Sequence, residues 1–97
     1  MDDRLGKVVY SKSGRDRGRM FVVVEVVNEN FVLIADGDLR KIENPKVKNI
    51  KHLAFTTTRA EAVKAYLDRR EIPPNHVIRK NLRSLKESGE SDGKEVW

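Results

Sequence analysis

The chain has 97 residues, of which 36% are charged, and its formal net charge is +5. This length corresponds to one small domain. Because the sequence contains no cysteine, disulfides and thiolate metal sites are excluded. It lacks the apolar segment of a secretory signal and any apolar run near the roughly 20 residues of a membrane span, so we expect a soluble, cytoplasmic protein. The basic excess fits either a polyanion-binding surface or a generally well-solvated one.

The first half of the chain has the composition of short β-strands. Apolar runs such as "FVVVEVV" and "FVLIA" alternate with turn signals such as "NEN" and "DGD", and Asp-Gly is a strong hairpin signal. Turns at such close spacing predict a small antiparallel barrel of about five strands. The strands are predicted in 6–12, 19–30, 31–36, 38–45 and 46–55.

The second half of the chain has a helical pattern. Thr58 and Glu61 have the spacing of a capping box, which predicts the start of a first helix that Pro73 and Pro74 end. A second helix is predicted over 75–87, where apolar residues recur at helical spacing before a glycine. The predicted organisation is a barrel at 1–55, a helical extension packed on or beside the barrel at 56–87, and a polar, disordered tail at 88–97.

Basic residues concentrate in two segments that the moderate net charge conceals. Residues 4–19 contain six basic residues and one acid, and residues 40–51 contain five basic residues and one acid. The first segment includes the loop "SKSGRDRGRM", in which glycine permits tight turns and arginine offers forked donors for phosphate oxygens. Such a loop is suited to binding a phosphodiester backbone. A solvated hairpin whose arginines only prevent edge pairing of the strands explains the same composition nearly as well.

The stretch "GKVVYSKSGRDRGRMFVVVEVVNENFVLIADG" (6–37) resembles a KOW motif, with Gly6 near a strand start and the motif glycine at Gly18. With the continuation "IADGDLRKIENP", residues 5–54 are similar to the fourteen-e family of archaeal and eukaryotic large-subunit ribosomal proteins and their small bacterial relatives. The resemblance implies an SH3-like barrel of about five strands that contacts ribosomal RNA, without catalytic activity or cofactor. It also implies a role in translation and an association with the ribosome.

The resemblance implies RNA contacts by the basic loop and by the basic segment after "DGD", chiefly to phosphate and sugar. The second predicted helix offers secondary candidates in Arg79, Lys80 and Arg83, whereas Tyr10 and Phe21 near the loop are expected in the core rather than as stacking platforms. The candidate RNA-binding residues are Lys7, Lys12, Arg15, Arg17, Gly18, Arg19, Arg40, Lys41, Lys46, Lys48 and Lys51.

The remaining polar residues favour no other chemistry. Asp36 and Asp38 lack further ligands at EF-hand spacing, so a tight hairpin is predicted there rather than a cation site. His52 and His76 are isolated, and no catalytic motif is present, so we expect no metal, no small-molecule substrate and no enzyme activity. Neither predicted helix has the face of a membrane-binding helix. Because SH3-like barrels also bind proteins, the alternative function is an interaction module for ribosomal proteins or polymerase.

Overall fold

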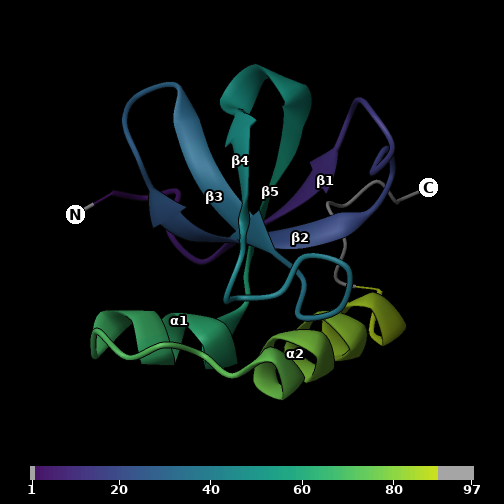
Figure 1. The fold of residues 1–97 in the computed structure, drawn as a ribbon. Coiled ribbons are helices and arrows are strands. Elements are labelled where there is room, and N and C mark those ends of the chain that lie inside the picture. The colour runs from purple at the N-terminus through teal and green to yellow at the C-terminus, as the bar shows by residue number, and fades with distance from the viewer. Residues whose placement is uncertain (1, 90–97) are drawn as a thin grey trace.

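The computed structural model describes residues 2–89, in which a five-stranded antiparallel sheet carries two helices on one face (Figure 1). Most of the tail predicted at 88–97 therefore lies outside the described residues. The elements are β1 (Lys7–Ser11), β2 (Met20–Val26), β3 (Phe31–Ala35), β4 (Lys46–Asn49), the 3₁₀ helix η1 (Ile50–His52), β5 (Leu53–Arg59), α1 (Glu61–Asp68) and α2 (Asn75–Glu87).

The strands pair in the order β4-β3-β2-β1-β5. Each consecutive pair from β1 to β4 forms an antiparallel hairpin, and β5 returns to lie beside β1. The register sets Val9 opposite both Phe21 of β2 and Phe55 of β5. The prediction of a five-stranded antiparallel sheet followed by two helices is therefore confirmed.

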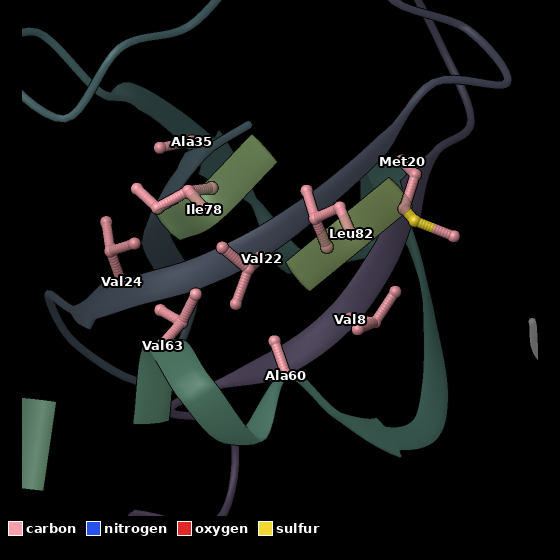
Figure 2. Packing of buried hydrophobic residues seen from close by; sticks show 9 residues of the cluster. All are labelled: Val8, Met20, Val22, Val24, Ala35, Ala60, Val63, Ile78 and Leu82. Carbon is pink, nitrogen blue, oxygen red and sulfur yellow. The ribbon is translucent and has the colours of Figure 1, made fainter. Parts of the chain in front are cut away.

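Both faces of β1 and β2 are buried, which explains their uninterrupted apolar runs. Successive side chains of a strand point to opposite faces, so one set packs among the strands and the other meets the helices. The inner cluster consists of Val9, Phe21, Val23, Val32, Ile34 and Leu53. The outer cluster consists of Val8, Met20, Val22, Val24, Ala35, Ala60, Val63, Ile78 and Leu82. Figure 2 shows the outer cluster, in which Val63, Ile78 and Leu82 of the helices gather around Val22 of β2.

The predicted strand at 38–45 is a turn-rich connection instead. The buried carboxylate of Asp36 accepts hydrogen bonds from the backbone N–H groups of Asp38 at 3.0 Å and Arg40 at 2.8 Å. Local bonds of this kind compete with strand pairing. The chain therefore turns tightly around the Asp36 side chain, and the Asp36 N–H closes the turn by donating to the Arg40 carbonyl at 2.9 Å, but no strand follows the turn in 38–45.

The predicted strand at 46–55 is divided in two by η1. The Asn49 side chain accepts a hydrogen bond from the Lys51 N–H at 3.0 Å, which caps this short helix and ends β4. The chain then resumes as β5, which continues to Arg59, beyond the predicted end. The count of five strands is therefore right, but the predicted division of the sequence among them is wrong.

The start of α1 also differs from the prediction. Thr58 lies in β5, where a run of β-branched threonines favours the extended chain, so the helix begins only at Glu61. The N-cap residue is Ala60, which has no side-chain acceptor. Asn81 of α2 supplies one instead, because its Oδ1 accepts a hydrogen bond from the Val63 N–H at 3.1 Å. The first helix is therefore capped by the second.

The second helix spans Asn75–Glu87 as predicted, and Gly89 beyond it has a φ of 76°. Its first turn approaches the β3–β4 connection closely: Asn75 Oδ1 accepts a hydrogen bond from the Ile42 N–H at 2.8 Å. A Cβ atom at Gly37, whose φ is 77°, would collide with the Asn75 carbonyl oxygen. Glycine is therefore required there by both conformation and space. Neither helix within residues 2–89 is long and apolar enough to cross a membrane.

Candidate nucleic-acid interface

The loop 12–19 between β1 and β2 is closed by its own backbone. The Gly18 N–H donates to the Ser11 carbonyl at 2.8 Å, and the Ser11 N–H donates to the Arg19 carbonyl at 3.1 Å. Gly18 has a φ of 83°, a left-handed conformation that favours glycine. The loop is therefore a defined turn, and the side chains of Arg15 and Arg17 on it are exposed.

Two buried carboxylates hold this loop against the β3–β4 connection. Asp16, only 4% exposed, accepts hydrogen bonds from Nε and Nη2 of Arg40 at 3.3 and 3.2 Å. Arg19 donates to the buried Asp36 at 2.6 Å and to the exposed Asp38 at 3.2 Å. The hydrogen bond to Asp36 is the main reason that the pKa of Arg19 is raised above its ordinary value. Two of the predicted RNA-binding cations are thus paired within the protein.

The second basic segment lies directly beside the loop. The Lys12 N–H donates to the His52 carbonyl at 2.9 Å, which joins the start of the loop to η1. The Lys48 ammonium on β4 lies 3.5 Å from the Ser13 carbonyl oxygen, a contact between residues 35 positions apart. The fold therefore brings together two basic segments that are distant in the sequence.

Several of the predicted cations have exposed side chains. Lys12, Arg15 and Arg17 face solvent, and none of them forms an ion pair with another residue between 2 and 89. The same holds for Lys41 and Lys51 within the described part of the chain. We call Lys12, Arg15 and Arg17 together the basic loop face.

Two further predicted residues, Lys7 and Lys46, are partly buried. Lys7 lies at the start of β1, a strand's length from the loop, and its ammonium is 3.8 Å from the Asp3 carboxylate and 3.5 Å from the Thr56 carbonyl. Lys46 is partly buried at the start of β4, opposite Ile34. Lys7 therefore belongs to a different part of the surface from the basic loop face.

The basic side of α2 lies across a groove from the loop. The groove has a volume of about 350 Å³, and its lining includes Gly18 from the loop and Arg79 and Arg83 from the helix. Arg79 is anchored, because its Nη1 donates to the Gly37 carbonyl at 2.6 Å. Lys80 is exposed but does not line the groove. The groove thus joins the loop to two of the three secondary candidates.

Sequence reasoning missed the residues that position the loop and those that line the groove. Asp16 is the single acid in a strongly basic loop, and such an isolated acid is itself a signal of an internal ion pair. Tyr10 and Lys86 line the groove, although the sequence assigns Tyr10 to the core. Tyr10 belongs to both the groove and the core, since it lines the groove while it is partly buried and packs against the outer cluster.

Compared with known proteins, the chain is distantly similar to archaeal large-subunit ribosomal proteins. It is 36% identical over 53 residues to "Large ribosomal subunit protein eL14" of Desulfurococcus amylolyticus, covering 54% of each chain. It is 41% identical over 58 residues to the protein of that name from Pyrobaculum arsenaticum, covering 59% of this chain and 55% of the relative. The chain therefore spans about half the length of the curated relatives it matches. No family model matches it. The similarity predicted from the KOW-like stretch is confirmed.

Proposed function

We propose that this chain is a non-catalytic RNA-binding protein of the ribosomal type, which contacts the backbone of structured, ribosomal RNA through its basic loop. The observation that carries the proposal is the junction of the loop with the second basic segment, through the hydrogen bond from Lys12 to His52 and the contact of Lys48 with Ser13. The names of the two relatives support the ribosomal setting. On this proposal the protein acts in the cytoplasm, in association with the ribosome and its proteins.

The proposal gives the predicted cations two kinds of role. Arg19 and Arg40 hold the loop in place by pairing with Asp36 and Asp16. The basic loop face, with Lys41 and Lys51 beyond it, contacts phosphates, because exposed and unpaired cations can release counterions from RNA when they bind it. Contacts of this kind position the protein on the RNA without reading its sequence.

The proposed architecture is an SH3-like barrel. In a flat sheet, β4 and β5 would lie four strand spacings apart, or about 19 Å. The three residues of η1 that connect Asn49 to Leu53 can span at most about 14 Å. The sheet must therefore curve to bring its edge strands toward each other, and the inner cluster lies among the curved strands.

Crosslinking in cells tests the proposed function. RNA crosslinked to the tagged protein by ultraviolet light is sequenced, and the crosslinked peptides are identified by mass spectrometry. We expect fragments of ribosomal RNA attached to peptides from the basic loop face. The first variant, Arg15→Gln with Arg17→Gln, should lose the crosslink. The matched control, Arg69→Gln with Arg70→Gln, removes the same charge from two exposed positions just after α1 and should keep the crosslink.

The alternative function, protein interaction, is tested in the same cells. If partners of the tagged protein vanish after ribonuclease treatment, RNA holds the complex together. If the partners survive ribonuclease and no RNA crosslinks are found, the chain is a protein-interaction module, and the proposal is wrong.

A further inference from the structure

The groove between the loop and α2 has an apolar floor. Tyr10 and Met20 are directly opposite each other in the pairing of β1 with β2, so their side chains lie together on one face of the sheet. Leu82 of α2 lies beside them, and Figure 2 shows it next to Met20 at one end of the outer cluster. The volume of about 350 Å³ lies within the range of clefts that hold small ligands.

The groove also carries a surplus of positive charge. Its two acids, Asp36 and Asp38, are both paired with Arg19. Arg83 and Lys86 line the groove from α2, three positions apart and thus on one side of the helix. Both are exposed, and neither forms an ion pair with any residue in the range 2–89. These two cations are therefore available to an anionic group bound in the groove.

We propose that this groove receives one unpaired nucleotide of the bound RNA, with its base over Tyr10 and Met20 and its phosphate at Arg83 and Lys86. The inference rests on the proposed RNA-binding function and narrows its ligand. The preferred RNA is a structured one in which a single nucleotide bulges out, next to the helical segment whose backbone the basic loop face contacts.

The combination of chemistries favours a nucleotide over other anions. A base offers a flat apolar surface that stacks on an aromatic ring such as Tyr10, and stacking tolerates any base. The attached phosphate matches the forked donors of Arg83. An uninterrupted RNA duplex keeps its bases stacked inside and offers none to the groove, whereas bulges and loops present bases that can be extruded. An acidic peptide would use the cations but leave the aromatic floor without a matching group.

Three labelled RNA hairpins test this inference by fluorescence anisotropy. They share one stem, which is continuous in the first, carries one bulged adenosine in the second, and carries an abasic residue at the same position in the third. We expect the full-length protein to bind the bulged RNA about tenfold more tightly than the continuous one. The abasic RNA, which has the bend but no base, should lose most of that gain.

Matched variants assign the effect to the groove. Arg83→Gln should reduce the preference for the bulged RNA, whereas Arg70→Gln removes the same charge at an exposed position outside the groove lining and should leave the preference unchanged. Tyr10→Leu should abolish the preference, and if this variant does not fold, Arg83→Gln still decides the matter. The sequence contains two methionines, so the methyl signal of Met20 is easily followed by NMR. This signal should shift when the bulged RNA is added and should not shift when the abasic RNA is added.

The outcomes separate this inference from the proposed function. If the protein binds none of the three RNAs, the proposed function itself is wrong. If the protein binds all three equally, or if Arg83→Gln keeps the full preference for the bulged RNA, RNA binding stands and the groove site is refuted. The groove site is also refuted if a glutamate-rich peptide, rather than RNA, shows an affinity that depends on Arg83.

Discussion

Single residues fix the shape of the basic loop, and the most informative of them is acidic. The Asp16 carboxylate is buried within the loop and is bound by the guanidinium of Arg40, which is 24 positions away in the sequence. A charge taken out of water in this way is costly without its partner. Asp16 therefore holds the loop in position for the three exposed cations around it.

Replacement of Asp16 distinguishes this role from simple electrostatics. We expect Asp16→Asn to lower the free energy of unfolding by about 1–3 kcal/mol, because it leaves Arg40 without its anionic partner. We also expect weaker RNA binding, although the variant is more positive by one charge. Chemical denaturation and anisotropy with a ribosomal RNA fragment measure the two effects. Tighter RNA binding at unchanged stability would show that the loop needs no such anchor.

Gly18 and Gly37 can be compared directly, because their backbone conformations are nearly the same. Their φ angles are 83° and 77°. Within residues 2–89, a Cβ at Gly18 would meet no atom within 4 Å beyond its chain neighbours, whereas one at Gly37 would collide with the first turn of α2. We expect Gly18→Ala to cost about 1–2 kcal/mol of unfolding free energy for the left-handed conformation alone. Gly37→Ala should cost clearly more. Equal melting temperatures for the two alanine variants would contradict the close approach of α2 to the turn.

The helices differ in how far each depends on the rest of the molecule. The second helix was predictable from its own sequence, because its apolar spacing and the glycine after it are local signals. The first helix has only eight residues, too few for an independently stable helix, and its cap comes from Asn81 of α2. Its start was mispredicted because β-branched threonines extended β5 past the expected cap.

The cap at Asn81 is testable. We expect Asn81→Ala to lower the free energy of unfolding by about 1 kcal/mol, as the loss of an N-cap does, and to speed amide exchange in the first turn of α1. Because Asn81 does not line the groove, RNA affinity should stay the same. Asn44→Ala, at an exposed position in the β3–β4 connection, is the control. If both alanine variants are equally stable, the side-chain cap has no role in holding α1.

At the scale of the whole molecule, the sequence predicted the number of strands, the pair of helices and the two basic segments, since each depends on local composition. It did not predict which cations are paired within the protein. Arg15, Arg17 and Arg19 look equivalent in the sequence, yet Arg19 binds the buried Asp36, 17 positions away. Such pairs depend on the meeting of distant segments, which local patterns do not specify. Arg19 is therefore left unchanged in the variants that test RNA binding.

The central claim is that the basic loop face neutralises RNA phosphates. The salt dependence of RNA binding tests this claim most directly. The logarithm of the affinity for a ribosomal RNA fragment is measured against the logarithm of salt concentration. We expect a steep slope for the unaltered protein and a slope shallower by about 1–2 for Arg15→Gln with Arg17→Gln, since each lost phosphate contact removes nearly one unit. Arg69→Gln with Arg70→Gln should leave the slope unchanged. A slope that is flat, or that the two double variants change equally, would contradict the account.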